Sequence, residues 1–103
     1  MKITVICRVE PGCLGPDGAD HVEKFCILGQ KEFNKIDPDQ IQWKIIPRFD
    51  KNKPEIQYKL NGRYLNKNQS VAYLRALGKS QDKFEEILFK QLSDSVNHYF
   101  GRY

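Results

Sequence analysis

The chain has 103 residues, of which 40% are hydrophobic and 29% are charged, and its formal net charge is +4. These values are typical of globular proteins and exclude intrinsic disorder. The length predicts one compact domain over residues 1–103, because two domains would each be too small to bury a core. No apolar stretch approaches the roughly 18 to 20 residues that span a bilayer, so no membrane interaction is expected.

The three cysteines bear on the compartment in which the protein works. An odd count argues against a disulfide framework, and free thiols are typical of a reducing compartment. The apolar run within residues 1–7 is too short for a signal peptide. We therefore expect a cytoplasmic protein.

The first third of the chain predicts a strand, a loop and a helix. Apolar side chains alternate over residues 3–9, which is the period of a strand. Three glycines and two prolines follow and predict a loop of defined shape. Asp20, with Glu23 three residues later, has the spacing of a capping box, so a helix is expected over residues 21–34. Its expected buried stripe consists of Val22, Phe25, Cys26, Gly29 and Phe33.

The middle of the chain predicts further strands. Residues 41–49 alternate between apolar and polar side chains, and residues 55–60 do so again. Between the second of these runs and residues 63–65, Asn61 and Gly62 supply the two positive φ values of a type I′ hairpin turn. We therefore expect an antiparallel hairpin here.

Two helices are expected in the last third. Asn66, with Gln69 three residues later, predicts the capped start of a short helix that Gly78 ends. Ser80 is expected to cap a final helix that runs to about Phe100. Its broad apolar face consists of Phe84, Ile87, Leu88, Leu92, Val96, Tyr99 and Phe100.

The predicted order of elements is therefore β-α-β-β-β-α-α. This order indicates an α+β fold, a small two-layer sandwich in which helices pack on one face of a mixed sheet of three or four strands.

Cysteines near the glycine-containing loop are candidates for chemistry. Cys13 precedes a helix N-terminus, where the helix dipole and free N–H groups would stabilise a thiolate, so it is a possible reactive thiol. His21 is a candidate base for this thiol. Three thiolates and one imidazole would also satisfy a tetrahedral zinc ion, with Cys7, Cys13, His21 and Cys26 as the ligands.

The spacing of the cysteines favours instead a structural role for them, with no bound cofactor. The closely spaced pairs of zinc motifs are missing, and so is the C-x-x-C of thioredoxin-type chemistry. Cys7 and Cys26 also fall on expected core faces, where a free cysteine behaves as a small hydrophobic residue.

Positive charge is concentrated in residues 41–80, which hold nine Lys or Arg residues and only two Asp or Glu residues. The candidate contacts for an acidic partner or a phosphate are Lys44, Arg48, Lys59 and Arg63. Trp43, Phe49 and Tyr58 share faces with apolar neighbours and are expected in the core. The polar face is thus expected to offer no platform on which nucleic-acid bases could stack.

Three functions stay open. The sequence has no nucleophile motif, and this favours a non-enzymatic interaction or accessory module that presents its basic sheet face or its last helix to a protein partner. The last helix could also join two copies as a homodimer. The alternatives are a thiol or zinc site around Cys13 and weak nucleic-acid binding through residues 41–80.

Overall fold

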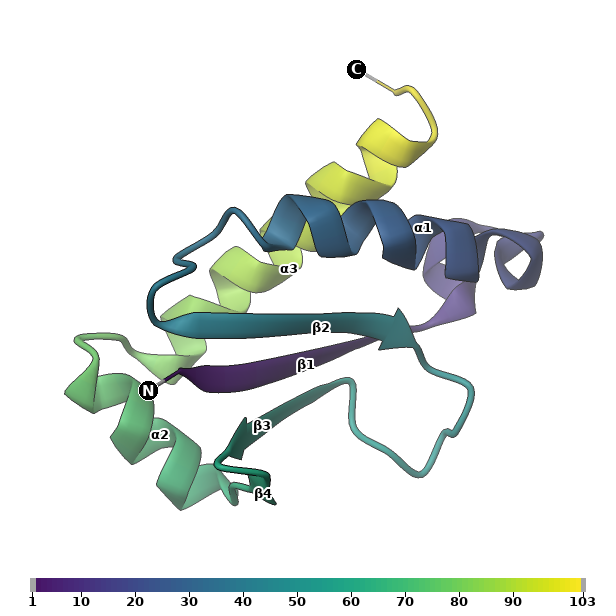
Figure 1. Cartoon of the computed structure of the whole chain (residues 1–103). Helices are drawn as coiled ribbons and strands as arrows, with labels where there is room; N and C mark the ends of the chain where they lie inside the picture. The colour runs from purple at the N-terminus through teal and green to yellow at the C-terminus, as the bar shows by residue number, and fades with distance from the viewer. Residues whose placement is uncertain (1, 103) are drawn as a thin grey trace.

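The computed structural model describes residues 2–102 (Figure 1). In chain order its elements are β1 (Ile3–Val9), a short 3-10 helix η1 (Pro11–Leu14), α1 (Gly18–Phe33), β2 (Ile41–Pro47), β3 (Ile56–Leu60), β4 (Arg63–Tyr64), α2 (Lys67–Ala76) and α3 (Gln81–Tyr99). Apart from η1, this is the order that the sequence predicts.

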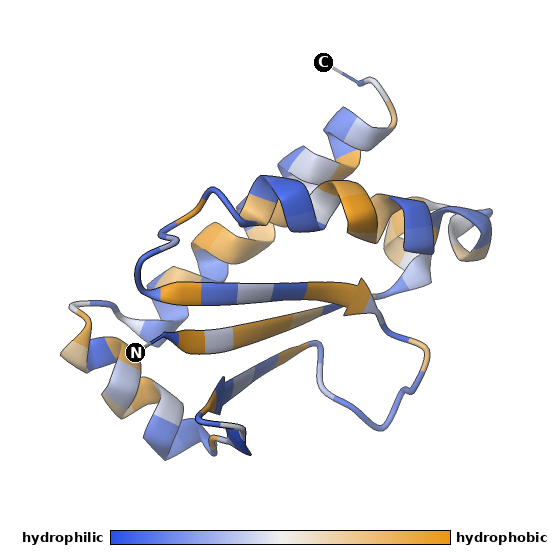
Figure 2. Cartoon of the chain, in the orientation of Figure 1, coloured by the Kyte–Doolittle hydropathy of each residue, from blue (hydrophilic) through white to orange (hydrophobic). Residues whose placement is uncertain are grey.

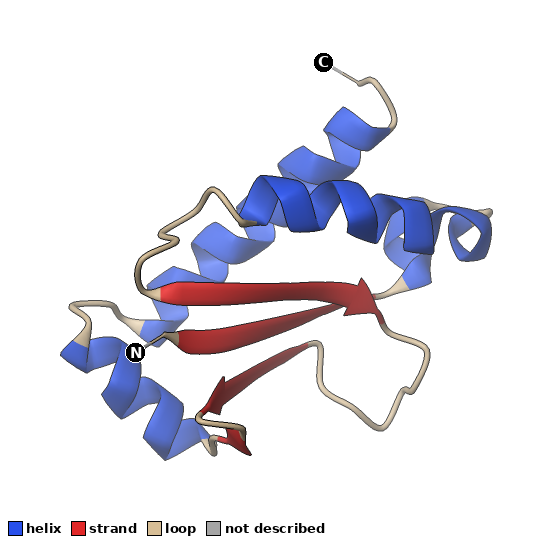
Figure 3. Ribbon diagram, in the orientation of Figure 1, coloured by secondary structure: helices blue, strands red, loops and turns tan. Residues whose placement is uncertain are grey.

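The strands form one mixed sheet in the order β2-β1-β3-β4. β1 runs parallel to β2, with Ile3 opposite Ile41, and antiparallel to β3, with Thr4 opposite Lys59. α1 connects the two parallel strands and packs on β2 and against α3, and α2 packs against α3 (Figure 3). The predicted α+β sandwich, with its helices on one face of the sheet, is therefore confirmed.

The core lies between the sheet and the helices. The helix-facing side chains of β1 are Ile3, Val5, Cys7 and Val9, and each is at most 1% exposed. The stripe predicted for α1 is also buried in full, and the most hydrophobic strands of the sheet are β1 and β2 (Figure 2). Because full burial of one such side chain contributes about 1.5 to 3 kcal/mol, this layer is the main source of stability.

Two local signals in the sequence are confirmed. Asn61 and Gly62 have φ values of 53° and 77°, as the two central residues of a type I′ turn require. At the start of α2, Asn66 accepts a hydrogen bond from the Gln69 backbone, and the Gln69 side chain accepts one from the Asn66 backbone. This is the predicted capping box.

The predicted start of α1 at His21 is wrong. The helix begins at Gly18 with Asp17 as its N-cap, and Asp20 lies inside the first turn. Gly18 packs so closely on η1 that an added Cβ would lie 1.7 Å from the carbonyl oxygen of Pro11. The helix therefore begins at a residue where only glycine fits.

Two side chains that the sequence places on apolar faces are exposed. Phe49 is 65% exposed because β2 ends at Pro47, so strand alternation no longer sets its direction. Ile87 is 57% exposed on α3, of which only Leu88 and Ser95 are buried. The apolar face of α3 is thus only partly covered. In the part of the chain that the structure describes, no helix has both the length and the apolar character needed to cross a membrane.

The outer edge of β2 is closed by the side chain of Gln30 from α1. Its Nε2 donates to the Trp43 carbonyl at 2.8 Å, and its Oε1 accepts from the Ile45 N–H at 2.8 Å. These two backbone groups, on either side of Lys44, are the ones that a parallel neighbouring strand would use. The amide of Gln30 therefore takes the place of one residue of a further strand and protects an edge that could otherwise pair with another chain.

We expect Gln30→Ala to lower the free energy of unfolding by about 1 to 3 kcal/mol, because it leaves two strand-edge groups without a partner. The same variant should associate through β2 in a concentration-dependent way. Urea unfolding and sedimentation velocity measure the two effects. Gln30→Glu is the matched control, because its carboxylate still accepts from Ile45 but cannot donate to Trp43. A Gln30→Ala protein as stable and as monomeric as the wild type would contradict this role.

Candidate functional site

The candidate functional site is the sheet face turned away from the helices, which we call the open face. The strand register places on it Thr4, Ile6 and Arg8 of β1, Gln42, Lys44 and Ile46 of β2, Gln57 and Lys59 of β3, and Tyr64 of β4. None of these positions holds an aspartate or a glutamate. The strands therefore give this face positive charge only.

Lys59 and Tyr64 form the side of the open face nearest β4. They are opposite one another in the β3–β4 register, and Lys59 Nζ lies 4.8 Å from the centroid of the Tyr64 ring. This distance is that of a cation–π contact. Tyr64 is 54% exposed, so much of its ring stays accessible to a partner.

Lys44 occupies the β2 side of the same face and is exposed. Between Lys44 and Gln57 lies Ile6, their partner in both registers, which is only 4% exposed. Long side chains on both neighbouring strands flank Ile6, since lysine and glutamine can cover apolar surface with their aliphatic parts. The open face thus has an apolar centre beneath polar groups.

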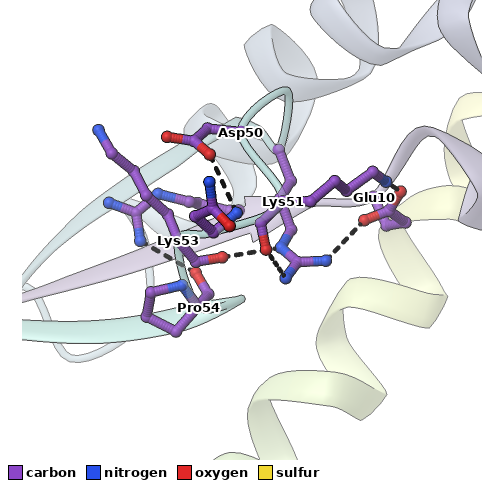
Figure 4. A network of polar contacts seen from close by, with 8 residues as sticks. Glu10, Asp50, Lys51, Lys53 and Pro54 are labelled. Carbon is purple, nitrogen blue, oxygen red and sulfur yellow. Dashed lines mark hydrogen bonds and ion pairs between the residues drawn. The ribbon is translucent and has the colours of Figure 1, made fainter.

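Arg8 links the open face to the loop of residues 48–55, and Figure 4 shows the polar contacts of this loop around Lys53 and Pro54. Its Nη1 donates to the Pro54 carbonyl at 2.9 Å and to Gln57 Oε1 at 2.8 Å. Arg8 is 6% exposed, so its charge lies under the loop rather than at the surface.

Arg48 organises the same loop from the end of β2. Its Nε donates to the Lys53 carbonyl at 3.0 Å, its Nη2 to the Lys51 carbonyl at 3.1 Å, and its Nη1 to Glu10 Oε2 at 3.0 Å. Lys51 pairs with the other oxygen of Glu10. The guanidinium of Arg48 is therefore committed to loop structure through all three of its nitrogens.

The four basic residues singled out from the sequence occupy different environments. Lys44 and Lys59 lie on the open face, as the alternation predicts. Arg48 lies beyond β2 and holds the loop. Arg63 precedes Tyr64 and so points to the opposite side of β4. The structure thus brings two of the four together on one surface.

Two residues of the open face were not identified as site residues from the sequence. Tyr64 could have been placed, because a two-residue turn at Asn61 and Gly62 fixes the register that sets Tyr64 opposite Lys59. The position of Arg8 could be predicted from the sequence only in part. Its parity places it on the polar face, but nothing local shows that the loop of residues 48–55 folds over it.

Two of the three cysteines belong to the core. Burial raises the pKa of the Cys7 thiol to about 12, with smaller contributions from negative charge on Cys26, Glu55 and Cys13. Burial also raises the pKa of Cys26 to about 11, followed by the effect of Glu23. Both thiols are therefore protonated at neutral pH, and a protonated thiol is a poor nucleophile and metal ligand.

Cys13 is exposed in η1, and its backbone N–H donates to the Glu10 carbonyl. The proposed base, His21, is engaged elsewhere, because its Nδ1 lies 3.0 Å from the Tyr99 hydroxyl and its ring packs edge-on against Phe100. Among residues 2–102 no three His, Cys, Asp or Glu side chains are grouped so that they could hold a metal ion. The thiol and zinc sites thus stay predictions that the geometry does not support.

The groups that the open face presents are suited to binding. Ammonium groups, amides and one phenol ring can hold an anionic partner through charge, hydrogen bonds and ring contact. Across residues 2–102, no protein-family model, no curated protein and no solved structure matches this chain.

Proposed function

We propose that the protein is a non-enzymatic binding module that docks an acidic segment of a partner protein on its open face. The observation that carries the proposal is that the strand positions of this face include Lys44 and Lys59, whose charges are not covered by the loop, and no carboxylate. Such a face attracts a segment rich in aspartate and glutamate and disfavours a basic one. Gln42 and Gln57 add hydrogen-bonding groups, and Ile46, which is 39% exposed, adds an apolar contact.

The edge of the sheet supports docking on the face rather than addition of a strand. A peptide that adds a strand needs free backbone groups along a sheet edge. At β2 the groups beside Lys44 already bond to Gln30. The opposite edge strand, β4, has only two residues.

Stacking of nucleic-acid bases has less support. Binding of single strands normally uses aromatic rings on which successive bases stack. Trp43 and Tyr58 are buried on the helix side, as the sequence predicts. Among the strand positions of the open face Tyr64 is the one aromatic residue. A single aromatic ring beside Lys59 therefore gives little support for nucleic-acid recognition.

A second copy of the chain is also a poor occupant of the open face. In a twofold dimer the same surface of each copy meets the other. Here this would bring Lys44 and Lys59 of one copy towards the same cations of its partner.

The three free cysteines fit a reducing compartment, so we propose that this module works in the cytoplasm.

The test is an NMR titration of the whole isotope-labelled protein with a short synthetic peptide that alternates glutamate and leucine. We expect saturable changes in the amide signals of β1, β2 and β3 that weaken as salt is added. A peptide that alternates lysine and leucine and a single-stranded oligonucleotide are titrated in parallel. Tighter binding of the oligonucleotide would favour the nucleic-acid alternative.

Matched charge reversals locate the interface. Lys44→Glu with Lys59→Glu should weaken binding of the acidic peptide by about tenfold or more, or roughly 1.4 kcal/mol. Lys24→Glu with Lys83→Glu makes the same change in net charge at exposed positions of α1 and α3, and should change the affinity less than about twofold. Equal losses in the two double variants, or signal changes confined to the helices, would refute the proposal.

A further inference from the structure

A pocket of about 370 Å³ lies on the helix side of the sheet, which is opposite the open face. It is enclosed by the end of α1 and the turn after it, by the first half of β2, and by α3. It is partly open to solvent and is therefore a surface pocket rather than an internal void. It falls within the range of 300 to 1,000 Å³ that is typical of small-molecule sites.

Part of the pocket wall is apolar, with three aromatic and four aliphatic residues, and the rest is polar. Phe33 and Trp43 meet edge-on, with ring centroids 5.1 Å apart, and Phe84 stacks on Trp43 at 5.8 Å with an angle of 12° between the planes. Ile41 and Leu88 are buried beside them. These rings hold one another in place, which pre-forms the apolar surface for a ligand.

The helix that closes the pocket leaves it accessible. Ile87 lines the pocket and is nevertheless 57% exposed. The end of α3 is fixed, because Tyr99 packs on Phe25 and hydrogen-bonds to His21. The part of α3 that borders the pocket runs from Phe84 to Asp94.

The charges around the opening balance. Lys79 and Asp37 lie 2.9 Å apart as an ion pair, and Lys90 and Asp94 are the other two charged residues in the lining. Two lysines and two aspartates give no net charge, so no charged ligand is favoured. A charged molecule would lose part of its hydration and meet charges of both signs, so its net electrostatic gain is small.

We propose that this pocket binds a small, uncharged, apolar ring compound. Phe84 and Ile87, which are not buried, supply the apolar contact, and the balanced rim selects against charge. Gln91 also lines the pocket, and because its Nε2 donates to Ser95 Oγ at 3.3 Å, its Oε1 is the group that can accept from one polar group of the ligand.

Trp43 gives a direct signal for the test, because it is the one tryptophan of the chain and lines the pocket. Its indole Nε1 donates to the Ile36 carbonyl at 2.9 Å, and Ile36 is also part of the lining. In NMR titrations of the full chain, naphthalenemethanol should shift the indole N–H signal in a saturable way. Naphthoate and naphthalenemethylamine, the anionic and cationic counterparts, should each bind about tenfold more weakly.

Paired variants on one helix distinguish binding in the pocket from non-specific adsorption of the ligand to apolar surface. Ile87→Asp places a carboxylate at the opening and should weaken naphthalenemethanol binding by about tenfold or more. Phe89→Asp changes a side chain that is 44% exposed on the same helix but does not line the pocket, so affinity should change less than about twofold. Both positions are exposed, so folding is preserved.

Three results would overturn the proposal. One is the lack of a saturable shift of the Trp43 signal, and another is equal weakening by the two variants. The third is a wild-type dimer in sedimentation velocity that Ile87→Asp dissociates, because a second copy would then occupy the opening. None of these results depends on whether the open face binds an acidic segment.

Discussion

Gly18→Ala should lower the free energy of unfolding by about 3 kcal/mol or more, placing it among the most damaging single changes in the chain. The added Cβ would lie 1.7 Å from the Pro11 carbonyl oxygen and 2.7 Å from the carbonyl carbon. These contacts are with backbone, so no rotation of a side chain can relieve them. η1 and the start of α1 must separate, and the burial of Leu14 at their junction is lost with them.

Gly12→Ala is the matched control in the same loop. A Cβ at residue 12 would meet nothing closer than the Glu10 Cγ at 4.0 Å, which is an ordinary contact. Urea unfolding of both variants, followed by circular dichroism, should show wild-type-like stability for Gly12→Ala alone. If the two variants have the same midpoint, the close packing of Gly18 on Pro11 does not limit stability.

Alkaline pH should destabilise the protein strongly. The free thiol pKa of 9.0 rises to about 12 for Cys7 and to about 11 for Cys26, mainly because the thiols are buried. Burial and the hydrogen bond to Glu85 also raise the pKa of Tyr58. Between pH 9 and 12 the unfolded chain has therefore lost protons that the folded chain keeps, so the free energy of unfolding falls as the pH rises.

The contribution of Cys7 alone is about 4 kcal/mol across this range, at 1.36 kcal/mol per pKa unit. It is fully present below pH 9 and is lost as the pH approaches 12. Urea unfolding at a series of pH values measures the slope. Cys7→Ala should flatten it, whereas Cys13→Ala, at an exposed position, should leave it unchanged. An identical slope in wild type and Cys7→Ala would show that the buried thiol does not control alkaline stability.

The parts of the fold that could be predicted from the sequence are those set by neighbours in the chain. The turn at Asn61 and Gly62 and the capping box of Asn66 depend on residues at most three positions apart, and both are confirmed. The buried stripe of α1 follows from helical periodicity alone. The start of α1 was predicted too late because Gly18 is held by its packing on η1, and such a contact cannot be inferred from residue spacing.

The candidate site was predictable only where strand alternation continued. Lys44 and Lys59 lie within strands and point as expected, whereas Arg48 and Phe49 follow the last residue of β2, where the alternation ends. The pocket beside Trp43 could not be predicted, because it forms where residues 33–43 meet residues 79–94, two segments that are far apart in the sequence.

The arrangement of Arg8 and Arg48 has a consequence for the order of folding. Between them these side chains hold three carbonyl groups in residues 51–54, one from β1 and the other from just beyond β2. The bonds of Arg48 to the loop span five residues or fewer and can form before any strand pairs. The bond of Arg8 to Pro54 needs β3 beside β1. We therefore expect the loop to acquire its structure in two steps, a local turn around Arg48 and then the attachment of its Pro54 end to the sheet.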